Sequence, residues 1–187
     1  PIIDNVALMF QRESMFNYLK SWERERIEKL GYFSSVVGDS FSSGDQRRAV
    51  AVAENWEYQW GNVIDIDSSL HFEDFSFSEE AQWAYIPIDR SIVEDSVVLL
   101  TCAGSGRELR HFSKLSPRKI LVNEIGSEIY RLTELLPDAL EKIVLVRSDV
   151  THLPFRNGVA DLAVCDHGLQ HVLDHRVAFG ELARATR

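Results

Sequence analysis

The sequence is poor in several features that mark particular classes of protein. Its 187 residues include two cysteines and five prolines. Both cysteines lie in apolar, strand-like segments, so a disulfide framework and a cysteine-rich zinc site are excluded, and we predict no metal and a cytoplasmic location. No apolar run approaches the roughly 20 residues that a membrane span needs. The sequence shows no basic region followed by a short apolar stretch near Pro1, so we expect neither export nor membrane insertion.

Positive charge is also scarce. Lys and Arg number 20 against 29 Asp and Glu, which gives a net charge of -9. Such a balance opposes binding to nucleic acid or to an anionic membrane surface, and we expect neither partner. The 45% hydrophobic and 26% charged residues are typical of a folded protein. A chain of this length buries roughly 70% of the surface that its unfolded form exposes, which is enough for a proper core.

Composition changes near residue 91 and divides the chain into two parts. Residues 1–91 form a helical, aromatic-rich segment, in which apolar spacing predicts helices near 12–30 and 45–57. The stretch 61–89 has no sustained period, so we expect an ordered loop region there. Residues 92–187 follow a different pattern.

That second part alternates short apolar runs with helical stretches, which is typical of βαβ units and a parallel sheet. The expected strands are residues 96–101, 119–123, 143–147 and 161–165. The expected helices are residues 107–115, 127–136 and 175–186, the last capped by Asp174. The pattern therefore predicts an α/β fold with a parallel sheet and flanking helices.

The first two strands end in residues that suit a nucleoside. After the first strand comes a turn, here named the glycine turn, made of Ala103, Gly104, Ser105 and Gly106. Its glycines let the backbone approach a ligand closely, and the helix that follows directs unpaired N–H groups toward it. The second strand ends at Glu124, 18 residues after Gly106, close to the spacing of a ribose-binding acid.

The third strand ends at Asp149 and Val150. One carboxylate and one backbone N–H are able to bind the amino group and a ring nitrogen of adenine. Because the carboxyl ends of parallel strands meet at one edge of the sheet, these groups together predict an adenosine-shaped site. A dinucleotide-binding fold has a third glycine at the position where this sequence has Leu109. This difference disfavours NAD as the cofactor.

The arrangement resembles the class I methyltransferases that use S-adenosylmethionine, over residues 97–187. The segments that carry the resemblance are Val98–Gly106 (VLLTCAGSG), Glu124, Ser148–Phe155 (SDVTHLPF), Asp161–His171 (DLAVCDHGLQH) and Phe179–Arg184 (FGELAR). The resemblance implies a Rossmann-like sheet, S-adenosylmethionine as cofactor and a small-molecule methyl acceptor. The cofactor-binding residues that it implies are Ala103, Gly104, Ser105, Gly106, Glu124, Ile125, Asp149, Val150 and Asp166. His167 and His171 flank the pocket mouth by analogy, as catalytic bases or substrate contacts.

Two short N-terminal segments resemble parts of the same proteins. Pro1–Phe10 (PIIDNVALMF) is similar to the last strand of a small zinc-ribbon-like domain that precedes some of these methyltransferases, without the cysteines that would bind metal. Trp56–Gly61 (WEYQWG) resembles an aromatic segment that lies over their cofactor pocket. We expect either core packing or a lid at this second segment.

Departures from the family keep two other functions open. Leu100 stands where the family commonly has an acid, and Cys102 and Ala103 replace its usual glycine and cysteine. This atypical loop suits a catalytically silent, methyltransferase-like binding or assembly module. The generic strand, glycine turn and helix would also suit an NAD-dependent oxidoreductase.

The sheet of the family is longer than the one predicted here. The family continues through three further strands, so the strand at 161–165 would be left as a bare edge. We therefore expect a partial sequence, or another segment or chain that covers this edge, including a second copy in a homo-oligomer.

Overall fold

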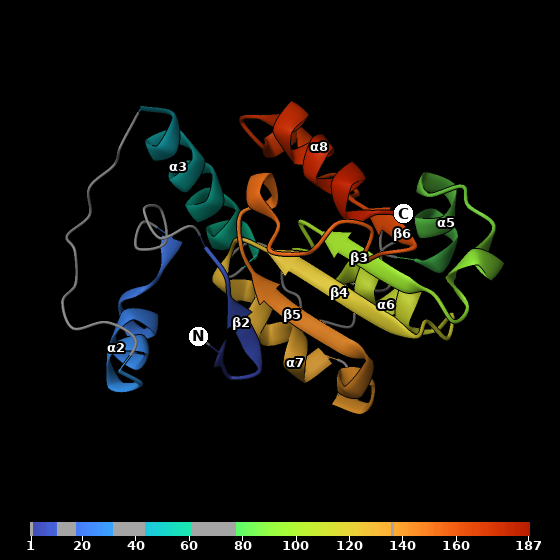
Figure 1. Ribbon diagram of the computed structural model, residues 1–187, viewed down its shortest axis with the longest axis horizontal. Helices are drawn as coiled ribbons and strands as arrows, with labels where there is room; N and C mark the ends of the chain where they lie inside the picture. The colour runs from blue at the N-terminus through green and yellow to red at the C-terminus, as the bar shows by residue number, and fades with distance from the viewer. Residues whose placement is uncertain (1, 11–17, 32–43, 61–77, 136) are drawn as a thin grey trace.

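The computed structural model describes residues 2–10, 18–31, 44–60, 78–135 and 137–187. They form a sheet that carries helices on both faces (Figure 1). Its six strands lie in the order β1-β2-β5-β4-β3-β6. The strands are β1 (Ile2–Ile3), β2 (Val6–Leu8), β3 (Val97–Thr101), β4 (Lys119–Glu124), β5 (Ile143–Arg147) and β6 (Leu162–Val164). The four predicted strands are confirmed, and every pairing is parallel except that of β1 with β2.

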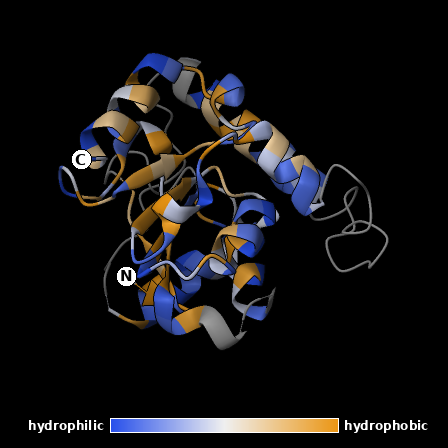
Figure 2. Ribbon diagram, turned by 90° about the vertical axis from the view of Figure 1, so that its right-hand side faces the viewer, coloured by the Kyte–Doolittle hydropathy of each residue, from blue (hydrophilic) through white to orange (hydrophobic). Residues whose placement is uncertain are grey.

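The central strands are apolar on both faces because helices cover both. In β3, Leu100 faces a core that includes Phe112, whereas its neighbour Leu99 faces a second core that includes Leu182. Phe112 belongs to α6 (Arg107–Ser113) and Leu182 to α8 (His175–Ala185). The predicted layered α/β fold is thus the observed one. Figure 2 shows the apolar strands at the centre and polar residues on the outer faces of the helices.

The other helices agree with the predictions unevenly. They are α2 (Ser21–Lys29), α3 (Gly44–Tyr58), α5 (Glu79–Tyr85) and α7 (Leu132–Leu135), with 3-10 turns at Arg90–Val93, Ser127–Arg131, Pro137–Lys142, Val150–His152 and Leu169–His171. Helix α3 confirms the prediction at 45–57. Helix α2 confirms the prediction at 12–30 only over Ser21–Lys29, because Lys20, which lies within the described residues, has an extended backbone and precedes the helix. Among the helices of the described ranges, none is both long and apolar enough to cross a bilayer.

Two expectations were wrong in detail. The stretch 61–89, predicted as loop, contains helix α5, which begins when the Ser78 hydroxyl accepts a hydrogen bond from the Ala81 N–H at 3.1 Å. Its Trp83 packs on Phe112 of α6 at 5.3 Å between ring centres. The helix expected at 127–136 begins as a 3-10 turn, and only its last part is α-helical.

A hairpin from the N-terminal part of the chain extends the sheet. Strand β2 pairs in parallel with β5, with Val6 opposite Leu145. The tight turn between β1 and β2 places Asp4 and Asn5 at positive φ, a conformation that these two residue types tolerate. The sheet therefore draws on residues from both sides of the compositional boundary near residue 91.

A buried ion pair fastens α2 to this edge of the sheet. Arg147 at the end of β5 is 1% exposed and donates to the fully buried carboxylate of Glu23 on α2. The same guanidinium donates to the backbone oxygens of Tyr18 at 2.7 Å and Ile125 at 2.9 Å. Tyr130 also donates to Glu23, at 2.7 Å. The pair thus holds together β5, α2 and the chain that follows β4.

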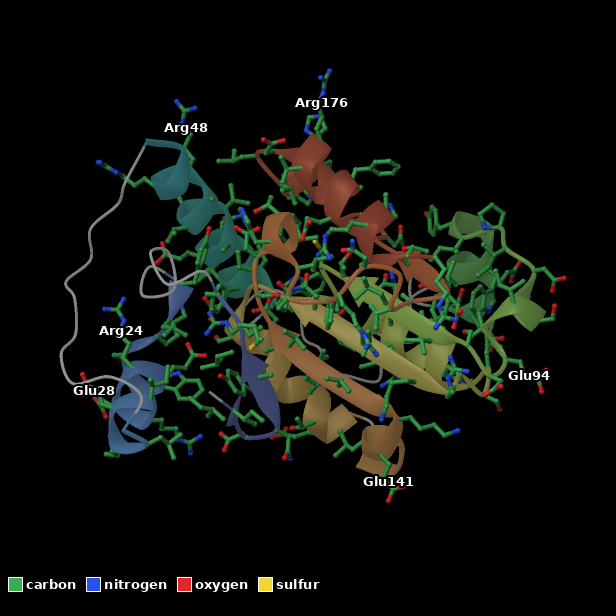
Figure 3. All side chains as sticks on the ribbon, viewed as in Figure 1. Arg24, Glu28, Arg48, Glu94, Glu141 and Arg176 are labelled. Atoms are coloured by element: carbon green, nitrogen blue, oxygen red, sulfur yellow. The ribbon has the colours of Figure 1, made fainter. Side chains whose placement is uncertain are left out.

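Strand β6 forms the opposite edge. Within the described ranges it pairs only with β3, as expected for residues 161–165. Charged side chains such as Glu94, Glu141 and Arg176 point outward at the periphery of the molecule (Figure 3).

Candidate active site

The order of the strands creates a crevice at one edge of the sheet. Strands β3, β4 and β5 lie side by side in sequence order, whereas β6 pairs with the opposite side of β3. Ligands of open parallel sheets bind at such a reversal, beyond the carboxyl ends of the strands. A cavity of about 650 Å³ lies there, and helix α3 contributes to its wall.

The cavity brings together ten of the eleven residues predicted for the site. They are Ala103, Gly104, Ser105, Glu124, Ile125, Asp149, Val150, Asp166, His167 and His171. Gly106 is not among the lining residues. It precedes α6 at φ 80, a left-handed conformation that favours glycine. The prediction of one shared hollow between Glu124 and Asp149 therefore matches the observed geometry.

The glycine turn is shaped by its contact with an aromatic ring. Gly104 has φ 46, and a Cβ at this residue would lie 2.9 Å from the indole of Trp60. Only glycine fits there without displacing the ring. Cys102 also has a positive φ, of 54, although it carries a side chain. Leu100 is 1% exposed and packs in the core with Phe112, so the side chain at this position does not reach the cavity.

Glu124 fixes the tip of β4 against the glycine turn. One carboxylate oxygen accepts the Gly104 N–H at 2.8 Å. The other accepts the N–H groups of Ile125 at 2.7 Å and Gly126 at 3.0 Å. These charge-assisted hydrogen bonds hold the carboxylate at the cavity wall, and its remaining lone pairs are able to accept further hydrogen bonds.

Asp149 lies at the tip of β5 and shapes a turn there. Its Oδ1 accepts the Thr151 N–H at 2.9 Å and the Thr151 hydroxyl at 2.7 Å. Its Oδ2 lies 3.4 Å from the Tyr18 hydroxyl, which also lines the cavity. Asp149 thus has the turn-forming role that is common for Asp, and it also lines the cavity.

The tip of β6 carries an ion cluster that sequence reasoning did not find. Arg107, the first residue of α6, donates to Glu108 at 2.8 Å and to Asp166 at 2.6 Å. Asp166 in turn lies 2.6 Å from Nδ1 of His167. An arginine in the first turn of a helix is unremarkable in sequence, and only the approach of β6 to α6 gives it this role.

The two predicted histidines differ in their surroundings. The side chain of His167 is 55% exposed, and its ring meets Tyr85 edge-on at 5.3 Å. His171 lies against Trp56, with ring centres 4.4 Å apart. Both line the cavity, so either is able to reach a molecule bound in it.

Apolar side chains from α3 form the wall that faces the strand tips. Ala49, Val52 and Trp56 of α3 all line the cavity, as does Trp60. Trp56 and Trp60 lie 6.1 Å apart between ring centres. The aromatic segment at 56–61 therefore covers the cavity over its described residues, in agreement with the lid interpretation.

Two buried acids border the cavity. Burial raises the pKa of Glu128 well above its ordinary value, and the nearby charge of Glu124 adds to this effect. Its Oε2 is buried and has no hydrogen-bond partner among the described residues. Burial also raises the pKa of Glu108, while Arg107 opposes that rise. The cavity wall thus offers acids that are easier to protonate than usual.

Known proteins resemble the same part of the chain. Residues 100–187, just under half of the sequence, match the family described as "Methyltransferase domain". Over 53 residues the chain is 40% identical to the demethylmenaquinone methyltransferase of Mycolicibacterium vanbaalenii, covering 28% of this chain and 23% of that protein. The match thus spans less than a quarter of the length of this curated relative.

Solved structures resemble the fold more widely. An S-adenosylmethionine-dependent methyltransferase from Aquifex aeolicus has a TM-score of 0.54 at 16% identity, over 70% of this chain and 67% of that one. A methyltransferase from Haloferax volcanii, solved in complex with the Trm112 methyltransferase activator, has a TM-score of 0.55 at 16% identity, over 71% and 55%. An S-adenosylmethionine-dependent methyltransferase from Mesorhizobium loti has 0.52 at 20%, over 60% and 49%. At these identities the likeness shows the fold.

Proposed function

We propose that the protein, whose residues 100–187 match the methyltransferase domain family, transfers a methyl group from S-adenosylmethionine to a small-molecule acceptor. The observation that carries the proposal is the single cavity at the strand reversal, which the glycine turn, Glu124 and Asp149 share. Three strand tips lie around one hollow, as a nucleoside requires.

The residues present suit the cofactor. A cavity of about 650 Å³ is within the usual range for sites that hold small molecules and cofactors. Its wall combines an aromatic face from α3 with backbone and carboxylate groups from the strand tips, the mixture that a purine, a ribose and a charged amino-acid tail need. When bound, S-adenosylmethionine supplies an electrophilic methyl group on its sulfonium.

Each strand tip has a distinct task in this proposal. Glu124 accepts hydrogen bonds from the ribose hydroxyls, because its oxygens keep free lone pairs beside their three backbone donors. Asp149 and the Val150 N–H bind adenine. Gly104 and Ser105 lie along the methionyl tail, with Ala103 and Ile125 as neighbours, and Gly106 shapes the turn. Asp166 borders the same end of the cavity through its ion pair with Arg107.

The acceptor side of the cavity carries the histidines. If the acceptor is a hydroxyl, either His167 or His171 is able to take its proton, because a neutral imidazole has one nitrogen that accepts a proton. Contact with Asp166 fixes the orientation of the His167 ring. The ring of Trp56 restricts the orientation of the His171 ring. Trp56 and Trp60 exclude water from the reacting groups, so positioning and desolvation are the main contributions of the chain.

The other partners follow from simpler observations. The open edge of β6 in the described part of the chain supports pairing with a further strand, including one from a second copy. The net charge of -9 supports the absence of a nucleic-acid partner. A cytoplasmic location rests on two cysteines that both remain free thiols.

A catalytically silent module is the second candidate. The observation that favours it is the crowded glycine turn, where the Trp60 ring lies against Gly104 and Arg107 is already paired with two acids. Such a site would keep the fold without admitting the cofactor.

Calorimetric titration of the full chain with S-adenosylmethionine, with its demethylated product and with NAD separates these functions. We expect binding of the first two and none of NAD. No binding of either sulfur compound by folded protein would refute the methyltransferase proposal and leave the silent module. Binding of NAD alone would favour an oxidoreductase.

A further inference from the structure

The only two cysteines of the sequence lie together at the strand reversal. Cys102 follows β3 and Cys165 follows β6, and these strands are neighbours in the sheet, with Leu100 opposite Val164. Continuing this register places Cys165 opposite Thr101 and Cys102 one residue further on. A strand spacing of about 4.8 Å and an offset of one residue keep the two Cα atoms near the span that a disulfide bridges. Cys102 lines the cavity, and both side chains are partly exposed.

The two sulfur atoms share one small space. A Cβ at Gly168 would lie 2.9 Å from each sulfur, so both thiols pack against the same point of the backbone. Contact between the two thiols is also the first cause of the pKa shift of each. No rearrangement of the strands is needed to bring the two sulfurs together.

The surroundings give the two thiols different reactivity. The hydrogen bond from Cys102 lowers the pKa of Cys165 to about 7, and the backbone N–H groups of Leu169 and Gly168 add to this effect against the cost of burial. The pKa of Cys102 is raised, first by its bond to Cys165, then by burial and by the charges of Glu124 and Asp149. A thiolate is the nucleophilic form, so Cys165 is the thiol that reacts first.

We propose that Cys102 and Cys165 form a peroxide-sensitive oxidation site, which closes as an intramolecular disulfide between the ends of β3 and β6. The thiolate of Cys165 attacks hydrogen peroxide, so an S–O bond forms, the O–O bond breaks, and the departing hydroxide takes up the thiol proton as water. The Cys102 sulfur then attacks the Cys165 sulfenic acid. An S–S bond forms, the S–O bond breaks, and a second water leaves with the Cys102 proton. Both sulfurs are oxidised and the peroxide is reduced.

Oxidation of the full chain by hydrogen peroxide tests the site. The reduced protein should bind two equivalents of N-ethylmaleimide, and the treated protein should bind none, remain a monomer on a non-reducing gel and lose two hydrogens in mass. Dithiothreitol should restore both thiols. Thiols that stay alkylatable, a disulfide between chains, or further oxidation of Cys165 to sulfinic acid would overturn the proposal.

Single variants test the order of the reaction. In Cys102→Ser, dimedone should trap a sulfenic acid on Cys165. In the matched variant Cys165→Ser, trapping on Cys102 should be at least about tenfold slower, because that thiol ionises less. Equal rates, in variants shown by circular dichroism to be folded, would contradict the assigned roles.

The site is linked to the cavity, and this part of the inference rests on the proposed function. A cofactor that fills the cavity packs against Cys102, the thiol that must move onto the Cys165 sulfenic acid, so the demethylated product at ten times its Kd should slow disulfide closure about tenfold. Unchanged oxidation in protein that binds the product would refute the link. Failure of product binding itself, measured by calorimetry, would refute the proposed function and leave the oxidation result standing.

Discussion

The carboxylate of Glu124 accepts a hydrogen bond from the backbone N–H of Gly104 at 2.8 Å. This contact joins the tip of β4 to the turn that follows β3, so the acid that suits a ribose also sets the shape of the glycine turn. A change at either residue should therefore alter the cavity wall at the tips of both β3 and β4.

Replacing Glu124 with Gln should weaken cofactor binding. The backbone N–H groups of Ile125 and Gly126 now face a carboxylate oxygen, and the amide would place its NH₂ group against backbone donors. A hydrogen bond to a charged group contributes about 1.5–3 kcal/mol, which the neutral side chain would lose. We expect the Kd for S-adenosylmethionine to rise about 10- to 150-fold in calorimetry. Glu141→Gln, at an exposed acid that points away from the molecule in Figure 3, is the matched control and should leave the Kd unchanged. Equal affinity in both variants would count against a ribose-binding role.

Replacing Gly104 with Ala should destabilise the glycine turn in two ways. The left-handed backbone costs a residue with a side chain about 1–2 kcal/mol, and the new Cβ would meet the Trp60 ring. Urea unfolding should show this loss, and the effects of Gly104→Ala and Trp60→Ala should not add, because the second removes the ring that the first displaces. Strict additivity would mean that the ring does not contact the turn in solution.

Removing one partner of the buried pair between Arg147 and Glu23 should be costly. Either Arg147→Met or Glu23→Leu leaves an uncompensated charge in the interior, which destabilises a protein by about 3–5 kcal/mol. The double variant should lose less than the sum of the two, as measured by urea unfolding. The exposed pair of Arg26 and Asp4 is the control, and Arg26→Ala should cost under about 1 kcal/mol. Similar costs at both pairs would show that Arg147 is not buried as described.

Glu128 should make stability fall as the pH rises. Burial raises the pKa of its carboxyl in the folded state, so the folded protein binds more protons than the unfolded chain above the ordinary value of 4.5. The free energy of unfolding then decreases with pH from that value up to the folded pKa, by about 1.4 kcal/mol for each unit of the rise.

The variant Glu128→Gln tests this assignment, because an amide cannot ionise. It should remove this part of the pH dependence and gain stability relative to the parent at neutral pH. The measurement is urea unfolding at a series of pH values. An unchanged slope would contradict a raised pKa at the buried Glu128.

The sequence was most informative where local pattern and burial agree. Strands β3, β4, β5 and β6 are short apolar runs that end in turn residues, so both their position and their cavity-facing ends could be predicted. Helix α5 could not, because its seven residues fall in a stretch without sustained period and are held by the contact of Trp83 with Phe112. The pairing of β2 with β5 depends on residues far apart in sequence, for which periodicity gives no signal.

The same distinction holds for the site. Glycines and acids at strand ends can be recognised in the sequence by residue type and spacing. Arg107 and Glu128 do not, because their properties come from what the fold places beside them: Asp166 in one case and a buried position next to Glu124 in the other. The adjacency of Cys102 and Cys165 likewise follows only from the return of the chain to the far side of β3.

The pairing of β2 with β5 also has a consequence for how the protein folds. Val6 must find Leu145, so this ladder closes a loop that contains most of the polypeptide, and such distant contacts slow folding. During synthesis the hairpin leaves the ribosome long before its partner strand exists. The earliest strands of this sheet in sequence are therefore among the last to be incorporated, and until then one flank of β5 stays open to mispairing with other nascent chains.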